Sequence, residues 1–122
     1  MSQEKENRSA EAARLAIEAL ENKKAKEIKV IDISKVSVIA DYFILVSGSS
    51  QRQTQAICDE IEFQLGKNGV EPKDKEGYQN GNWILLDYRD VVIHIFNSED
   101  RRFYNLERIW TDGTVIENVE SL

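Results

Sequence analysis

The sequence predicts an α/β domain in which helices pack on a mixed β-sheet. Three observations favour this fold class. Stretches with helical spacing alternate with short stretches rich in β-branched residues, YFILVSG at 42–48 is a continuous apolar run, and WILLDYRDVVIHIF at 83–96 has two apolar runs around a polar break. The continuous run is typical of a strand buried on both faces, and the interrupted one predicts a hairpin. At 122 residues the chain is long enough for one domain with a real core.

The first part of the chain predicts a helix followed by two strands. Ser9 is a suitable N-cap, so a helix is expected over 9–23, with alanines, Ile and Leu along one face. EIKVIDI at 27–33 alternates as a strand does. SKVSVIAD at 34–41 is expected to cross over, and the central strand at 42–48 follows.

A second helix is expected after the central strand. Ser50 and Gln53 have the spacing of a capping box, which predicts a helix from there to about Lys67, with Gly69 as its natural stop. Phe63 is expected to point away from the core as a partly exposed residue. The core side of this helix should consist of Ile57, Cys58, Ile61 and Leu65.

The stretch over 75–96 predicts a three-stranded antiparallel meander, because Asn80-Gly81 is a strong signal for a two-residue turn. A two-residue loop at Arg89-Asp90 then sorts the hairpin side chains onto two faces, since neighbours on a strand point in opposite directions. One face is apolar and should be core: Ile84, Leu86, Tyr88, Val91, Ile93 and Ile95. The other, called here the mixed face, combines large apolar groups with a carboxylate and an imidazole: Trp83, Leu85, Asp87, Val92, His94 and Phe96.

The mixed face admits two interpretations. Large apolar groups rimmed by polar ones mark an interaction surface when they are exposed. Alternatively, a helix of the same chain covers this face, and His94 forms a hydrogen bond with Asp87 or with the backbone.

The C-terminal part predicts a last helix and a tail. SEDRRFYNLERIW at 98–110 returns to helical spacing, with Ser98 as a cap. The core of the domain is therefore expected over 9–112, and the short acidic tail at 113–122 is expected to fray.

Composition ranks the possible partners. The net charge is −6 and the pI about 4.9, which disfavours direct nucleic-acid binding, because that affinity comes from Lys and Arg at phosphates. The same charge favours a basic protein partner, or serves solubility alone. One cysteine excludes an internal disulfide and suits a reducing compartment, and the sequence contains no signal peptide or spanning segment, so a cytoplasmic location is expected.

The pattern closest to enzyme chemistry is LVSGSSQ at 45–51. A strand that ends in Gly-Ser before a helix offers N–H groups to a phosphate and resembles an element of nucleotidyltransferases. Those enzymes also need two carboxylates one residue apart for Mg²⁺, and no Asp-X-Asp follows the serines. A triad of Ser49 or Ser50, His94 and Asp87 lacks a nucleophile-elbow pattern, and one His with one Cys makes no usual zinc site. The chain is therefore predicted to have no catalytic residues, metal or cofactor.

Several stretches together resemble one family, the ribosomal silencing factors of the RsfS or Iojap type. The resemblance is carried by DISKVSVIADYFILVSGSSQRQTQAI (32–57), EGYQNGNWILLDYRDVVIHIF (76–96) and RRFYNLERIWTD (101–112), in the expected order. Arg89 is a departure, since the family commonly has glycine there. The resemblance implies a nucleotidyltransferase-like α/β fold without the catalytic carboxylate pair.

For function, the resemblance implies binding to the large ribosomal subunit through ribosomal protein L fourteen. The bound protein would block joining of the small subunit, repress translation when nutrients are scarce, and take part in large-subunit assembly. The mixed face is then the expected docking surface, and the site residues are Trp83, Leu85, Asp87, Val92, His94, Phe96, Arg102, Tyr104 and Glu107. Two other functions stay open: a nucleotide-binding enzyme that uses LVSGSS, and a homodimer that buries the mixed face.

Overall fold

The computed structural model describes residues 2–34, 40–98 and 114–116, with only the backbone described for 2–9, Lys26 and 114–116. The predicted α/β class is confirmed. The elements in chain order are α1 (Ser2–Asn22), β1 (Lys26–Asp32), β2 (Tyr42–Gly48), α2 (Gln51–Lys67), β3 (Asp74–Glu76), β4 (Trp83–Asp87), β5 (Val91–Asn97) and β6 (Thr114–Ile116).

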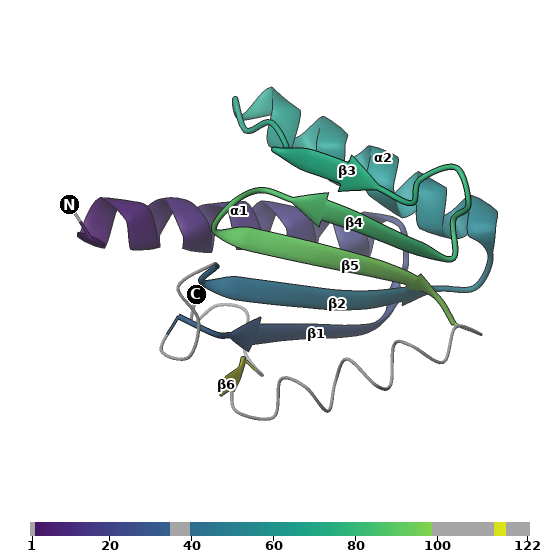
Figure 1. Ribbon diagram of the computed structural model, residues 1–122, viewed down its shortest axis with the longest axis horizontal. Helices are drawn as coiled ribbons and strands as arrows, with labels where there is room; N and C mark the ends of the chain where they lie inside the picture. Colours follow the sequence, from purple (N-terminus) through teal and green to yellow (C-terminus); the bar gives the residue numbers. More distant parts are fainter. Residues whose placement is uncertain (1, 35–39, 99–113, 117–122) are drawn as a thin grey trace.

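The strands form a six-stranded mixed sheet in the order β3-β4-β5-β2-β1-β6 (Figure 1). β2 and β5 pair in parallel, and every other neighbouring pair is antiparallel. The α2 helix therefore belongs to the crossover between β2 and β5, which a parallel pair requires. The predicted central strand is confirmed, because β2 lies inside the sheet and is buried from Ile44 to Gly48.

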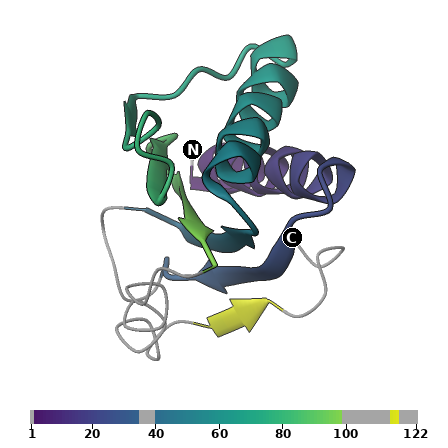
Figure 2. The same cartoon turned by 90° about the vertical axis from the view of Figure 1, so that its right-hand side faces the viewer.

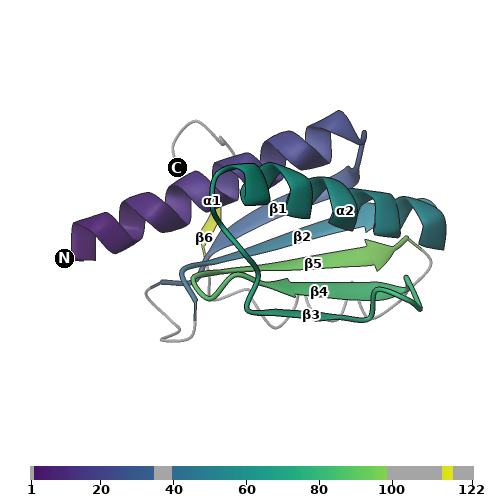
Figure 3. The same ribbon diagram turned by 90° about the horizontal axis from the view of Figure 1, so that it is seen from above.

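Both α1 and α2 lie side by side on one face of the sheet (Figures 2 and 3). Four alanines let α1 approach closely: Ala12, Ala13, Ala16 and Ala19 are 8% exposed or less. The predicted core side of α2 is confirmed, since Ile57, Cys58, Ile61 and Leu65 are fully buried. Phe63 is 58% exposed, as expected. The helices and the apolar face of the hairpin share one core cluster.

The opposite face of the sheet carries a second apolar cluster. It contains Ile31, Ile33, Ala40, Leu45, Val92 and Phe96, with Phe43, Trp83 and Leu85 packed against it. In the part of the chain that the structure describes, neither helix covers this face. The four apolar residues of the mixed face, Trp83, Leu85, Val92 and Phe96, are part of this second cluster.

The register predicted for the hairpin is confirmed at every position. β4 and β5 pair Trp83 with Phe96, Leu85 with His94 and Asp87 with Val92, as alternation required. The two-residue turn is closed by a hydrogen bond from the Tyr88 N–H to the Val91 carbonyl. Arg89 adopts a left-handed conformation there, with φ +74°, which a residue with a side chain rarely does.

The boundaries predicted for α2 are also confirmed. Ser50 is its N-cap, with Oγ accepting from the Gln53 N–H at 3.1 Å, and the helix ends at Lys67 before Gly69 at φ +77°. The capping box is only half formed, however. The Gln53 side-chain oxygen accepts from the N–H and hydroxyl of Ser49 rather than from the N–H of Ser50.

Two predictions near the N-terminus are wrong. The α1 helix starts at Ser2, so Ser9 lies inside it and is not a cap; the preceding residues are polar but include neither Gly nor Pro, and nothing in them stops a helix. The stretch over 34–41 does not cross over, because β1 and β2 are antiparallel neighbours with Asp32 opposite Tyr42. Asp32, the last residue of β1, lies at the start of this connection, and its Oδ1 accepts a hydrogen bond from the Ser34 N–H at 2.9 Å.

The meander is confirmed, but its first turn is longer than predicted. β3 and β4 pair Glu76 with Leu85, so the loop includes residues 77–82 rather than Asn80-Gly81 alone. Gly77 and Gly81 both have positive φ, and a Cβ on Gly77 would collide with the Trp83 carbonyl. The loop is wide because it also docks on α2, where the Thr54 hydroxyl donates to the Gly81 carbonyl at 2.6 Å.

The C-terminal tail differs from the expectation of fraying. Residues 114–116 form β6, which pairs antiparallel with β1. The Thr-Val-Ile triplet has the β-branched composition of a strand, but its partner lies far away in sequence. The helix predicted at 98–110 falls almost wholly outside the described residues. Neither α1 nor α2 is long and apolar enough to span a bilayer.

Candidate functional site

The candidate site is the mixed face, whose side chains come from three adjacent strands. β4 contributes Trp83, Leu85 and Asp87, and β5 contributes Val92, His94 and Phe96. The parallel register places Phe43 beside Val92 and Leu45 beside His94, so β2 extends the same face.

Four rings lie in contact across these strands. Trp83 stacks on Phe96 with ring centroids 5.1 Å apart and an interplanar angle of 25°. His94 lies 6.2 Å from Phe96 in a nearly parallel orientation, and Phe43 meets His94 edge-on at 5.5 Å. Aromatic pairs in these geometries add roughly 0.5–1.5 kcal/mol each beyond the area they bury. The rings therefore form a rigid row on the sheet.

A hydrogen bond joins the indole of Trp83 to the imidazole of His94. The Trp83 Nε1–H donates to His94 Nδ1 at 3.1 Å. Because Nδ1 accepts, the neutral imidazole carries its proton on Nε2. Burial lowers the pKa of His94 to about 4, so the ring is neutral near pH 7. The sequence predicted a hydrogen bond from His94 to Asp87 or to the backbone. In the structure its Nδ1 accepts from Trp83 instead.

The mixed face is less open than expected. Phe96 is 0%, His94 7% and Val92 8% exposed, whereas the three β4 residues are half-buried. An open surface was therefore the wrong expectation for the β5 members. The rings of Trp83 and Phe43 pack against His94, and Val92 and Phe96 belong to the second apolar cluster.

An acidic edge borders the mixed face, and the sequence analysis did not identify it. Directly paired residues share a face, so the pairs Asp74–Asp87 and Glu76–Leu85 place Asp74 and Glu76 on the same side as the mixed face. Both side chains are exposed. Lys75, between them, faces the helix side and pairs with Glu62 at 3.0 Å. The alternating acidic, basic, acidic triplet shows that the two acids share one face of a strand, but the pairing of β3 with β4 decides that this is the side of the mixed face.

Asp87 lies on β4 between Asp74 of the acidic edge and Val92 of β5. Its Oδ1 accepts a hydrogen bond from the Arg89 N–H at 2.7 Å, which leaves the other carboxylate oxygen for a further donor. The remaining expected site residues, Arg102, Tyr104 and Glu107, lie outside the described residues.

The strand-to-helix turn at 48–51 was the alternative site for chemistry. Its polar groups are engaged within the fold: Ser50 caps α2, and Gln53 accepts from Ser49. A Cβ on Gly48 would lie 3.0 Å from a Thr54 methyl, so this glycine permits close packing of strand on helix. The described residues contain no group of three or more side chains placed to bind a metal ion. Helix capping and close packing account for the Gly-Ser pattern without a bound ligand.

Comparisons with known proteins identify the same family over most of the chain. The family model described as "Ribosomal silencing factor during starvation" (RsfS) matches residues 6–122. The chain is 38% identical over 107 residues to the ribosomal silencing factor RsfS of Halalkalibacterium halodurans, covering 88% of this chain and 92% of that protein. It is 38% identical over 104 residues to RsfS of Bacillus subtilis, covering 85% and 88% respectively.

A solved structure and a more distant relative extend the comparison. A crystal structure of a Bacillus halodurans protein superposes with a TM-score of 0.81 at 35% identity, covering 88% of this chain and 98% of that one. A mouse protein named "Mitochondrial assembly of ribosomal large subunit protein 1" is 30% identical over 100 residues, covering 80% of this chain and 44% of that protein.

Proposed function

Because this chain belongs to the RsfS family of ribosomal silencing factors, we propose that it binds the large ribosomal subunit through ribosomal protein L fourteen and blocks joining of the small subunit. Translation would then fall when nutrients are scarce, in the cytoplasm. The printed family description names starvation, and the name of the mouse relative refers to assembly of the large subunit. A part in large-subunit assembly belongs to the same proposal.

The observation that carries the proposal is the combination of an aromatic row with an acidic edge on one face. Trp83 and Leu85 are half-buried and offer apolar area that a partner could cover. Asp74, Glu76 and Asp87 bring three carboxylates alongside, which suits Arg and Lys on a basic partner. Aromatic anchors with charged neighbours are the usual make-up of a binding hot spot and its rim.

The buried members of the site have a supporting part in this proposal. His94 accepts from the Trp83 indole, and Phe96 stacks on its ring, so together they fix the orientation of Trp83. A side chain held in one rotamer loses less entropy when it binds. Val92 belongs to the same apolar cluster as Phe96 and Trp83. The proposed surface also includes Arg102, Tyr104 and Glu107.

The proposed mechanism requires a steric obstacle and no reaction. A 14.0 kDa domain docked where the subunits meet would occupy space that the small subunit needs. The mixed face could also bury against a second copy of the chain off the ribosome. Docking and dimerisation would then compete, and light scattering at several concentrations separates monomer from dimer.

Sedimentation with separated ribosomal subunits tests the proposal. The protein should pellet with purified large subunits, and its addition should reduce the formation of joined ribosomes when small subunits follow. Cosedimentation with small subunits alone would overturn the proposal. Undiminished subunit joining at saturating protein would refute the steric mechanism while leaving ribosome binding intact.

A further inference from the structure

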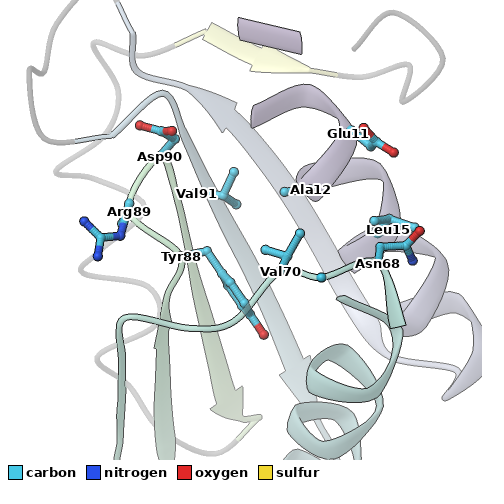
Figure 4. A pocket seen from close by; sticks show the side chains of 10 residues that line it. Glu11, Ala12, Leu15, Asn68, Val70, Tyr88, Arg89, Asp90 and Val91 are labelled. Carbon is cyan, nitrogen blue, oxygen red and sulfur yellow. The ribbon is translucent and has the colours of Figure 1, made fainter. Parts of the chain in front are cut away.

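A cavity of about 490 Å³ opens on the helix side of the sheet, away from the mixed face. It lies between α1, the C-terminal end of α2 and the β4–β5 turn (Figure 4). Its volume falls within the range of sites that hold small organic molecules, roughly 300–1,000 Å³. The proposed ribosomal contacts use none of the side chains that line it.

The walls of the cavity are mainly apolar. Leu15 of α1 and Val70 of the loop after α2 are half-buried, so part of their hydrocarbon surface faces open space. Tyr88 and Val91 contribute from the sheet side, and Ala12 leaves room between them because its side chain is a single methyl group. An occupant with an aromatic or aliphatic body would remove this surface from water.

The rim of the cavity has a negative bias. Glu11 and Asp90 both line it, although the Asp90 carboxylate extends away from the cavity in Figure 4. The carbonyl end of α2 arrives at Asn68 and carries the negative end of the helix dipole. The Asn68 side chain donates to the Gln64 carbonyl, which leaves its own oxygen as an acceptor. Arg89 is the cation of the rim, and its guanidinium extends away from the cavity in Figure 4.

Tyr88 adds a polar group that the fold does not satisfy. The side chain is 7% exposed, and its hydroxyl has no hydrogen-bond partner among the described residues. Burial raises the pKa of this phenol, and the charges of Glu62 and Glu71 act in the same direction. A buried donor without an acceptor costs about 1–3 kcal/mol. In Figure 4 this hydroxyl points past the loop that carries Val70, so an occupant of the cavity would contact the ring of Tyr88 and not its hydroxyl.

From these observations we propose that the cavity binds a small amphipathic cation, with an aromatic or aliphatic body between Leu15, Val70 and Tyr88 and an ammonium group at the rim near Glu11 and the carbonyl end of α2. An anionic analogue of the same shape would be repelled by the Glu11 carboxylate and bind far more weakly. The inference does not depend on the proposed ribosomal function, because the two surfaces lie on opposite sides of the sheet.

Amide NMR of the full-length, ¹⁵N-labelled protein tests this site, with phenethylamine as the cationic probe and 3-phenylpropionate as its anionic match. Phenethylamine should cause saturable shifts at Gly69, Val70 and the Arg89–Val91 turn, and 3-phenylpropionate should not. Glu11→Gln should weaken phenethylamine binding at least about threefold. Glu18→Gln, an equally exposed change further along α1, should leave it unchanged.

A variant that fills the cavity completes the test. Val70→Trp places a large side chain in the cavity from a half-buried loop position and should abolish the shifts while the spectrum stays that of a folded protein. No saturable shift with phenethylamine, equal binding of the anion, or full binding by a folded Val70→Trp protein would each overturn the proposal. Should Val70→Trp fail to fold, the Glu11→Gln and Glu18→Gln pair decides.

Discussion

The two faces of β5 differ in the kind of side chain they carry and in what those side chains contact. Val91, Ile93 and Ile95 face the helices and join the large core with α1 and α2. Val92, His94 and Phe96 face the other way and carry rings and a polar imidazole. The aliphatic face needs only shape and volume to fold, whereas the mixed face contains a specific hydrogen bond and ring geometry. The alternation of a single strand thus separates the large core from the proposed docking face.

The largest expected effect is a loss of stability from a change on the helix-facing side of β5. Ile93→Ala removes a fully buried side chain from beneath the helices and leaves a cavity. We expect the free energy of unfolding to fall by about 2–5 kcal/mol, measured by urea denaturation. Affinity for large subunits should change little under conditions where the variant remains folded. A loss below about 1 kcal/mol would mean that the core relaxes around the gap.

The second effect is a pH dependence that originates on the mixed face. The folded pKa of His94 is lowered from 6.5 to about 4 by burial, so the unfolded chain binds more protons between these two values. Stability from this residue is therefore present above pH 6.5 and is lost as the pH falls towards 4. The loss should amount to about 2–3 kcal/mol.

Comparing the unchanged protein with His94→Gln separates the contribution of His94 to the pH dependence of stability from that of the carboxylates. The difference in unfolding free energy between the two proteins should narrow as the pH falls from 6.5 to 4.5, because the variant lacks the titrating ring. A difference that stays constant over this interval would show that His94 has an ordinary pKa in the folded protein.

The third effect concerns recognition directly. Trp83→Ala truncates the half-buried ring that anchors the proposed docking face. We expect roughly 2 kcal/mol or more of lost affinity for large subunits, about a 30-fold rise in Kd. Phe63→Ala is the matched control, since Phe63 is exposed on α2 at the helix side. Equal affinities for the two variants would remove Trp83 from the interface.

The smallest expected effect comes from neutralising the acidic edge beside the mixed face. Asp74→Asn and Glu76→Gln remove exposed charges on the mixed-face side of β3. Each should weaken ribosome binding by about 0.5 kcal/mol, mainly through slower association, and flatten its dependence on salt. Glu21→Gln on α1 removes the same charge from the helix side and serves as control. A loss of the same size for all three would indicate a general effect of net charge.

Local patterns predicted much of the fold. Strand alternation and the two-residue turn predicted the hairpin register. The N-cap Ser50, the buried apolar side and Gly69 predicted where α2 begins and ends. The start of α1 was missed because polar helix formers extend it without any stop signal. Strand β6 was missed because its partner β1 lies more than 80 residues away in the chain, and short strands are decided by pairing rather than propensity.

The candidate site was likewise predicted from the sequence only in part. Sequence alone determined which six hairpin side chains share the mixed face, because a period of two follows from strand geometry whatever the neighbours are. Only the tertiary structure decided that the β5 members are buried, that Trp83 bonds to His94, and that Asp74 and Glu76 join this face. These facts depend on which strands lie side by side, and long-range pairing is a property of the packed chain that no local window of residues contains.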